Sequence, residues 1–463
     1  MIEVRCCHSL SDAAPVRVAM DALNRASARP DPFSTFEYYE NRLRIAVRFP
    51  PAPGLRLWLL LAFRNGALIG YAALKQTRHR VLGLHAAKLD WLTAGVADRP
   101  HLVARPEDAV EVGAAIHAYL LQRRREWSLL EFEQQEESSP LRRLPAAAAA
   151  ECRVREWPSP ANGTIPIRWA SLAAYFAALP KKSRSNVSRQ MRTLLAEGEV
   201  RLLTSSAPQA AGAMFALYRG IEQHSWKARA ATGVGQSAEL LAYYAGLMEP
   251  VQPMKLTFQL LLLDGAPIAG LICGSFGDGL HALRIAYDER LARLAPGSAM
   301  LLMGVRQAIE GGYRFFNLSR GSGYYKARWL AEMRETRIVQ VYRVGTPYYV
   351  RRALGDLWRR VAGRGGPPPA FNPARREVEA ARPGPSAPSW SPGEVPERLR
   401  HAALVSQVLR SPAEFLSTAE LAAILPFAAR RIADAKNPHG PFSPRGSLNQ
   451  GYAGAIGVAT VRS

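Results

Sequence analysis

The segment 317–326, Asn-Leu-Ser-Arg-Gly-Ser-Gly-Tyr-Tyr-Lys, concentrates side chains that can hold an anion or move a proton. It follows an apolar run that predicts a strand from Tyr313 to Leu318, and α/β sheets commonly bind ligands where strands end. Gly321 and Gly323 would let the backbone approach a ligand closely. The spacing does not match G-x-G-x-x-G, so a dinucleotide site is not indicated. The alternative is a basic surface turn with its aromatic residues packed into the core.

A second candidate site is the helix start in the segment 295–301, Ala-Pro-Gly-Ser-Ala-Met-Leu. A helix that begins at Pro296 with small residues in its first turn leaves N–H groups and a positive dipole end open to an anion. The strand-like run from His281 to Tyr287 lies shortly before it. These features favour a pyrophosphate cradle, although Pro-Gly-Ser also begins many helices that bind no ligand.

Two further clusters could contribute. The first is basic and could grip a phosphate or an acidic glycan, or form a solvated helix face; it comprises Lys181, Lys182, Ser183, Arg184, Asn186, Arg189 and Arg192. The second comprises Glu222, His224 and Trp226. His224 could act as a base near neutral pH, although a lone His beside a Trp is more often structural.

Two hairpins are predicted to organise these residues. Apolar strands flank Asn65-Gly66 in residues 57–74 and Asp264-Gly265 in residues 256–273, and both dipeptides are typical of two-residue turns with positive φ. In each half a helix and a strand follow, with helices predicted from Glu107 to Trp127 and from Pro296 to Ile309. Residues 172–203 predict two helices on either side of residues 180–184. The simplest explanation is a duplicated α/β unit, although two unrelated α/β segments could share this order.

The chain is therefore expected to divide into four parts. Residues 1–160 and 161–345 form two lobes, residues 346–397 form a basic, Pro/Gly-rich linker, and residues 398–463 form a short helical tail of unknown role. Only the second lobe is expected to bind a nucleotide. Glu107 and Asp108 in the first lobe would repel a pyrophosphate at the matching helix start.

Composition sets further limits. A formal net charge of +22 and a pI of about 10.3 favour polyanionic partners, although a GC-biased genome would encode a similar excess of arginine. The four cysteines form no C-x-x-C pair, so neither a metal site nor a disulfide framework is expected. With no secretory signal and no membrane span evident, we expect a cytoplasmic protein that could associate peripherally with the inner membrane.

Taken in order, these motifs resemble the CelD-like branch of the GNAT superfamily of acetyltransferases, which is related to the Fem-type transferases. The resemblance covers about residues 15–345. It is carried by residues 31–38 (Asp-Pro-Phe-Ser-Thr-Phe-Glu-Tyr), 182–186 (Lys-Ser-Arg-Ser-Asn), 224–226 (His-Ser-Trp), 264–269, 286–288, Pro296-Gly297, Arg320-Gly321 and 325–329. Asn317 departs from the pattern, because the family usually has an acidic residue before the Arg-Gly pair, and an amide cannot act as a carboxylate base.

The resemblance implies an α/β fold of two tandem GNAT-like lobes with mixed, mainly antiparallel sheets flanked by helices. It also implies direct transfer from acetyl-CoA or another acyl-CoA to an amine or hydroxyl, with no covalent enzyme intermediate and no metal. The expected catalytic residues are Tyr325, as proton donor to the thiolate, Tyr324 and His224. The expected cofactor-binding residues are Ala286, Tyr287, Arg293, Pro296, Gly297, Ser298 and Ala299. The expected substrate-binding residues are Lys182, Arg184, Asn186, Trp226, Asn317, Arg320 and Lys326.

Three functions follow from this resemblance. The first is an acyl-CoA acyltransferase acting on a small-molecule or glycan acceptor, in association with an envelope or exopolysaccharide synthesis complex. The second is a Fem-type transferase using aminoacyl-tRNA, which would give the net charge a direct purpose. The third is a non-catalytic GNAT-like binding subunit whose C-terminal segment docks a partner. The first is our prediction.

Overall fold

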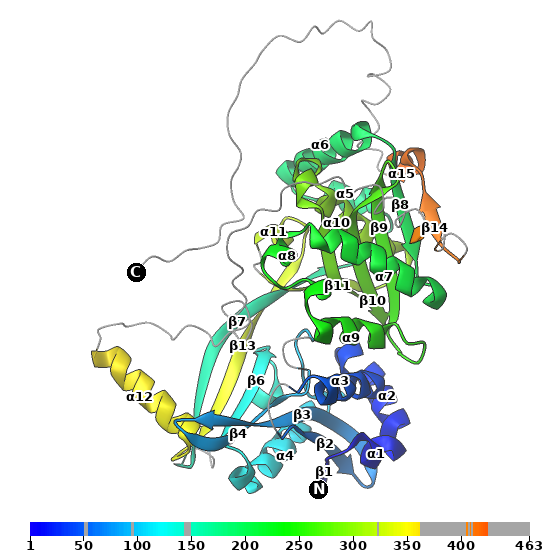
Figure 1. Ribbon diagram of the computed structural model, residues 1–463. Coiled ribbons are helices and arrows are strands. Elements are labelled where there is room, and N and C mark those ends of the chain that lie inside the picture. Colours follow the sequence, from blue (N-terminus) through cyan, green and yellow to red (C-terminus); the bar gives the residue numbers. More distant parts are fainter. Residues whose placement is uncertain are drawn as a thin grey trace, which may run out of the picture.

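The computed structural model describes residues 1–50, 54–93, 97–142, 150–321, 324–361, 404–405, 408 and 411–424. The side chains of residues 324–325 and 359–361 lie outside this description. Figure 1 shows two lobes joined by two long strands.

In the first lobe, helices cover both faces of the sheet. Its strands are β1 (Ile2–Cys7), β2 (Arg56–Arg64), β3 (Ala67–Val81), β4 (Leu84–Trp91), β5 (Val103–Ala104) and β6 (Leu129–Gln135). Its helices are α1 (Leu10–Ala13), η1 (Ala14–Val16), α2 (Arg17–Ala26), η2 (Pro32–Ser34), α3 (Phe36–Arg48), α4 (Ala109–Gln122), η3 (Arg124–Glu126) and η4 (Pro140–Arg142).

The second lobe repeats this arrangement on a larger scale. Its strands are β8 (Val200–Ser205), β9 (Lys255–Leu263), β10 (Ala266–Phe276), β11 (Gly279–Tyr287) and β12 (Phe315–Arg320). Its helices are α5 (Leu172–Ala178), α6 (Lys181–Glu197), α7 (Pro208–Gln223), α8 (Trp226–Arg229), η6 (Val234–Gln236), α9 (Ala238–Leu247), η7 (Glu289–Leu294), α10 (Pro296–Glu310) and α11 (Tyr324–Ala327). Residues 181–184, expected between two helices, form the first turn of α6, because Pro180 is tolerated directly before a helix.

Strands β7 (Cys152–Pro166) and β13 (Glu332–Arg343) join the two lobes into one 14-stranded sheet. β13 returns from the second lobe and inserts between β6 and β7, while the end of β7 pairs with β12. The expected boundary between residues 160 and 161 therefore falls inside a continuous strand. The predicted fold class, two GNAT-like lobes with mixed, mainly antiparallel sheets, is confirmed.

The two predicted hairpins share both their turn and an irregularity beside it. Asn65 and Gly66 have φ values of 51° and 77°, and Asp264 and Gly265 have values of 49° and 79°. In each hairpin the register shifts at the third residue after the turn glycine, Ile69 in the first lobe and Ile268 in the second. A bulge is not required by the turn, so its repetition at the same position supports a duplicated unit.

The lobes pack against each other through α3 and α9. The hydroxyl oxygens of Tyr38 and Tyr243 lie 3.1 Å apart, and Asn41 Nδ2 donates to the backbone oxygen of Tyr243 at 3.2 Å. One apolar cluster contains buried residues of both lobes, including Phe36, Tyr243 and Phe258. The lobes are therefore held in a fixed relation by a shared core.

Part of the expected linker and tail is ordered. Residues 347–361 form α12 (Pro347–Val361), because Tyr348 is buried against the sheet and anchors the helix. Further along, β14 (Glu414–Leu416) pairs with β8, and α15 (Thr418–Ile424) packs beside it. Residues 362–403 and 425–463, which make up most of the expected linker and tail, lie outside the described residues.

Candidate donor and acceptor sites

Strands β11 and β12 pair for only part of their length. They run parallel and are paired from Gly279 to His281, after which β11 continues to Tyr287 beside β10 alone, within the part of the chain that the structure describes. Ser319 Oγ donates to the backbone oxygen of Ala282 at 2.9 Å, and Lys227 Nζ donates to that of Ile285 at 2.6 Å. The second half of β11 thus presents alternate backbone groups that no strand covers.

The first turn of α10 adjoins the end of this open edge. Ala295 has a φ of 51° and turns the chain sharply, so that α10 begins at Pro296 close to the end of β11. A Cβ on Gly297 would lie 3.1 Å from the Tyr287 ring, so the glycine permits close packing of helix and strand. The structure therefore packs the first turn of α10, at Gly297, against Tyr287 at the end of β11. The expected role of Ala286, Tyr287, Pro296, Gly297, Ser298 and Ala299 in cofactor binding stays a prediction.

Arg293, also expected at the cofactor, is engaged elsewhere. Its guanidinium forms an ion pair with Glu197 at the end of α6, and the Arg293 side chain is 61% exposed. An exposed pair of this kind contributes little stability and can exchange for another anion.

A bulge at the end of β12 places Asn317 and Lys326. Asn317 is buried; its Oδ1 accepts from Ser319 N at 3.0 Å, and its Nδ2 lies 3.3 Å from His281 Nδ1. Ser319 has a φ of 60°, which the Asn317 bond helps to hold. Asn317 therefore supports the bulge, and its expected role in substrate binding stays a prediction.

Lys326 is fully buried, and its ammonium group donates a hydrogen bond to the backbone carbonyl of Ser319. Burial lowers the pKa of Lys326 to about 8, partly opposed by the charge of Asp98 from the first lobe. Asp98 also accepts from the backbone N–H of Arg320 at 3.4 Å. Lys326 and Arg320 thus lie where the first lobe meets the end of β12.

Lys227 belongs to a buried charged cluster that sequence patterns did not reveal. Its Nζ is 3.8 Å from Glu222 Oε1, and Arg284 Nη2 lies 2.8 Å from the same oxygen. Burial, and then the charge of Arg284, lower the pKa of Lys227 to about 7. A lysine that exchanges its proton near neutral pH beside an open strand edge can act as an acid or a base.

The neighbouring residues His224 and Trp226 are on the surface. His224 ends α7 and its backbone oxygen accepts from Glu289 N at 3.1 Å, while Trp226 is 47% exposed. Of the predicted cluster, Glu222 is the member that contacts Lys227 and Arg284, and the expected roles of His224 and Trp226 stay predictions.

The α6 cluster lies outside this group. Arg184 donates to the backbone oxygens of Ala177 and Leu179 and so caps α5, and Asn186 Oδ1 accepts from Arg189 at 2.9 Å. Lys182 is exposed in the first turn of α6. Tyr324 and Tyr325 begin α11, but their side chains lie outside the described residues, so their expected catalytic role stays a prediction.

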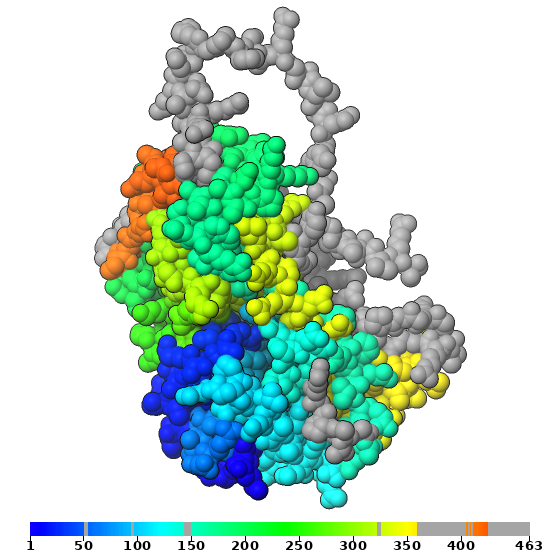
Figure 2. All heavy atoms as spheres, turned by 180° about the vertical axis from the view of Figure 1, so that it is seen from behind, coloured from blue at the N-terminus to red at the C-terminus, as the bar shows by residue number. Residues whose placement is uncertain are grey.

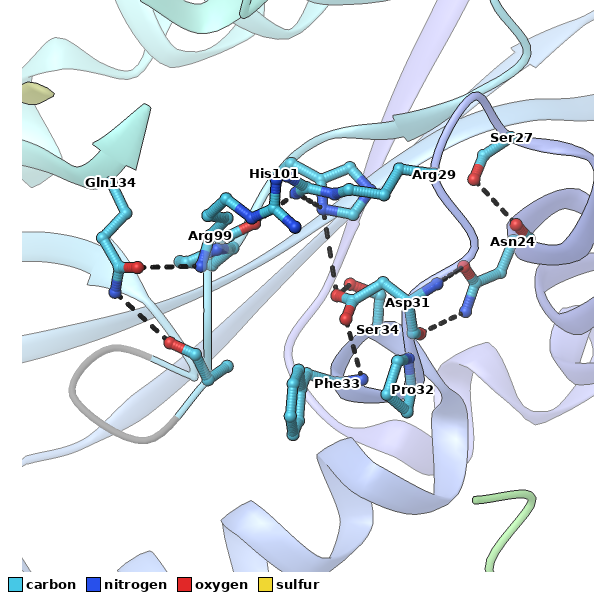
Figure 3. Close-up of polar contacts among 12 residues, drawn as sticks. Asn24, Ser27, Arg29, Asp31, Pro32, Phe33, Ser34, Arg99, His101 and Gln134 are labelled. Atoms are coloured by element: carbon cyan, nitrogen blue, oxygen red, sulfur yellow. Dashed lines mark hydrogen bonds and ion pairs between the residues drawn. The ribbon is translucent and has the colours of Figure 1, made fainter. Parts of the chain in front are cut away.

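The first lobe contains a polar cluster that includes Arg29, Asp31, Arg99 and His101 (Figure 3). Arg29 Nη1 and Arg99 Nη1 lie 3.0 Å and 2.8 Å from Glu136 Oε1, and His101 Nδ1 is 3.8 Å from Asp31 Oδ2. Burial, and then the charge of Arg99, lower the pKa of Arg29 to about 10, against the opposing charges of Glu136 and Asp31. The cluster combines a buried guanidinium group, that of Arg99, and a half-buried one, that of Arg29, with one shared carboxylate.

This cluster is connected to the second lobe at two points. The ring of Phe33 lies 6.0 Å from that of His281, and Gln134 Oε1 accepts from both Arg99 N (3.0 Å) and Asn162 Nδ2 (3.2 Å). Burial, together with Arg99 and Arg29, lowers the pKa of His281 to about 3, so the ring is neutral. Arg29 and Arg99 of the first lobe therefore place positive charge near His281, which contacts Asn317 in the bulge that holds Lys326.

Within the described residues, no group of three or more His, Cys, Asp or Glu side chains could hold a metal ion. In the same part of the chain, no helix combines the length and apolar character needed to cross a bilayer.

Comparison with known proteins finds a family match in the second lobe. Residues 181–327 match the acetyltransferase (GNAT) domain family. A crystal structure of FemX aligns with a TM-score of 0.50 and 11% identity over 72% of this chain and 98% of that chain, which shows a shared fold. A tandem GNAT protein from the clavulanic acid biosynthesis pathway aligns with a TM-score of 0.42 and 13% identity over 75% of this chain and 99% of that chain. No curated protein is significantly similar in sequence. The second lobe therefore contains a GNAT acetyltransferase domain.

Proposed function

We propose that the second lobe transfers an acyl group from acyl-CoA to an amine or hydroxyl of a saccharide or polysaccharide precursor. The observation that carries the proposal is the open edge of β11, which ends at the first turn of α10. The unpaired backbone groups of β11 could bind an extended ligand, and the N–H groups in the first turn of α10 could bind a pyrophosphate. The two sets of groups adjoin each other.

The residues around these groups fit an acyl-CoA. Gly297 lets the first turn of α10 pack closely against Tyr287 at the end of β11, and neither Pro296 nor its neighbours bring an acidic group into that turn. In the first lobe, Asp108 precedes α4 and pairs with Arg64 at 2.6 Å, which places a carboxylate at the corresponding helix start. These differences favour one donor site per chain.

The buried lysines fit the proton transfers that acyl transfer requires. The donor supplies an activated thioester. Lys227, with a pKa of about 7, accepts the proton of the attacking amine or hydroxyl as its bond to the acyl carbon forms at the β11 edge. The carbon–sulfur bond of the thioester breaks at the same carbon, and Tyr325, the expected proton donor, would protonate the departing thiolate. Lys326, with a pKa of about 8, remains protonated at neutral pH and stabilises negative charge that develops at the end of β12.

The acceptor reaches this region from the first lobe. The half-buried Arg29 and the buried Arg99 place positive charge near His281, where they favour an acceptor that carries an anionic group. The ordered motifs shared with the CelD-like branch support a glycan acceptor in envelope or exopolysaccharide synthesis. Such a role suits a protein at the cytoplasmic face of the inner membrane.

One observation favours a second candidate, a Fem-type transferase that uses aminoacyl-tRNA. The net charge of +22 would strongly attract a long polyanion such as tRNA, whereas binding one CoA molecule does not require so large a positive charge. The likeness to FemX supports the fold of this candidate and not its donor.

Donor binding at increasing salt separates the two candidates. Acetyl-CoA and an aminoacyl-tRNA are titrated into the full chain over a range of salt concentrations, and transfer to amino sugars is followed by mass spectrometry. An acyl-CoA enzyme binds acetyl-CoA with a shallow salt dependence and acylates the sugar. Steep salt dependence with tRNA, and no acetyl-CoA binding, would establish the Fem-type candidate instead.

A further inference from the structure

Helix α12 has one face fixed to the sheet of the first lobe. Tyr348 is buried, and its ring lies 6.4 Å from that of His79 on β3. Arg352 lies over the ring of Trp157 at 4.5 Å, and Asp356 pairs with Arg352 at 2.9 Å. This face positions the helix, which Figure 1 shows running outward from the sheet.

The opposite face of α12 is an exposed apolar stripe. Val350, Leu354, Leu357 and Trp358 are 40%, 54%, 58% and 60% exposed. Their spacing is that of a single helix face. Large apolar residues scattered singly need no explanation, whereas a contiguous stripe of four marks a binding surface.

The surroundings of the stripe are basic. The acidic residue of α12, Asp356, points to Arg352 and also lies 3.6 Å from Arg155, so it is neutralised on the inner side. Arg351 is exposed on the helix, and the sequence places Arg359 and Arg360 directly after Trp358.

The turn between β3 and β4, two strands that α12 contacts, extends this surface. Leu82 and Leu84 are 51% and 62% exposed there, and Arg78 and Arg80 are exposed beside them. Residues 76–89 contain no acidic residue. Figure 2 shows the other side of the molecule, with α12 in yellow projecting at the edge of the first lobe.

We propose that the outer face of α12, together with the β3–β4 turn, binds the surface of an anionic lipid bilayer. An apolar stripe bordered by arginines and free of unpaired carboxylates complements acyl chains and anionic headgroups together. With 15 residues, α12 lies in the interface and does not span the bilayer. The surface belongs to the first lobe, so this proposal does not depend on the identity of the acyl donor.

Vesicle co-sedimentation of the full chain tests the proposal. Vesicles of phosphatidylcholine with phosphatidylglycerol should bind the protein, and pure phosphatidylcholine vesicles should bind it at least roughly tenfold less. The double variant L354E/L357E should lose at least roughly tenfold of the binding to anionic vesicles. The control V18E/V110E changes two exposed valines of the same lobe, 82% and 74% exposed, and should bind like the unmodified protein.

Other outcomes would overturn the proposal. Equal binding by L354E/L357E would show that α12 is not the contact, and failure of the unmodified chain to bind anionic vesicles would exclude a lipid partner. A dimer that L354E/L357E converts to a monomer, without vesicle binding, would identify the stripe as an interface between copies. Thermal unfolding of each variant checks that the fold is intact.

Discussion

At the scale of single residues, Lys227 is the side chain on which the proposed chemistry most depends. It acts as a base only when neutral, so activity should rise as pH increases through about 7. Lys326 must stay protonated, so activity should fall as pH increases through about 8. The expected pH profile is therefore a narrow bell.

Lys227→Met should slow turnover by roughly 10²-fold and remove the acidic limb of that bell, because methionine fills the space but cannot accept a proton. The pH dependence of kcat and kcat/KM with saturating donor measures both effects. Lys255→Met, at an exposed lysine of the same lobe, is the control. A Lys227→Met enzyme with an unchanged rate and profile would exclude the lysine as the base.

Buried histidines should make the fold sensitive to acid. Burial lowers the pKa of His281 to about 3 and that of His117 to about 4, whereas an unfolded histidine titrates near 6.5. Below pH 6.5 the unfolded chain therefore binds more protons, and the free energy of unfolding falls by up to about 1.4 kcal/mol per pH unit for each histidine.

Thermal unfolding between pH 7 and pH 5 measures this slope. His281→Asn should reduce the slope, and the exposed His85→Asn should leave it unchanged. A slope that is identical in His281→Asn and the unmodified chain would contradict the role of His281.

The site residues that sequence could predict are those joined by short stretches of chain. Tyr287 and Gly297 meet because β11, a brief turn and α10 follow one another. Lys227, Asp98 and Arg29 could not be found this way. Their proximity to β11, Lys326 and His281 arises from tertiary packing, and each is an ordinary surface residue type with no motif around it.

At the scale of elements, the hairpins and α10 were predictable because their signals are local. Asn-Gly and Asp-Gly set the turns, and Pro296 sets the helix start. The sequence did not predict that residues 347–361 and 414–416 form regular structure as α12 and β14. Both are short apolar stretches near Pro-rich segments, and what stabilises them is burial against a sheet face or pairing with a sheet edge, which the sequence does not reveal.

The pairing of β14 with β8 gives the C-terminal segment a structural role. Leu421 of α15 is buried in the core of the second lobe, and Thr418 Oγ1 accepts from Val200 N at 2.9 Å. Leu421→Ala should lower the free energy of unfolding by roughly 2–3 kcal/mol through the cavity it leaves.

Chemical denaturation measures that loss, with Val110→Ala, at an exposed valine, as the control that should change little. If Leu421→Ala were as stable as the control, the segment would not be part of the second-lobe core.

At the scale of the whole molecule, a single sheet extends through both lobes, and His281 of β11 lies near the polar cluster of the first lobe. The sequence predicted two lobes but not their continuity, because the insertion of β13 between β6 and β7 pairs residues far apart in the chain. The two lobes have similar hairpins, but their corresponding helix starts differ: α10 has no acidic residue in its first turn, whereas Asp108 precedes α4 and Glu111 lies in its first turn. The molecule is therefore expected to bind one acyl-CoA per chain.

Calorimetric titration of acetyl-CoA into the full chain and its Gly297→Asp variant tests this expectation most directly. The unmodified chain should bind one equivalent, and Gly297→Asp should bind about thirtyfold more weakly, a loss of about 2 kcal/mol, because a carboxylate then faces the pyrophosphate. Gly297→Ala, which adds only the contact with Tyr287, and Gln209→Asp, at the second position of the Pro-started helix α7, should bind more tightly than Gly297→Asp. Equal affinity of Gly297→Asp and the unmodified chain, or no binding by the unmodified chain, would contradict a donor site at the first turn of α10.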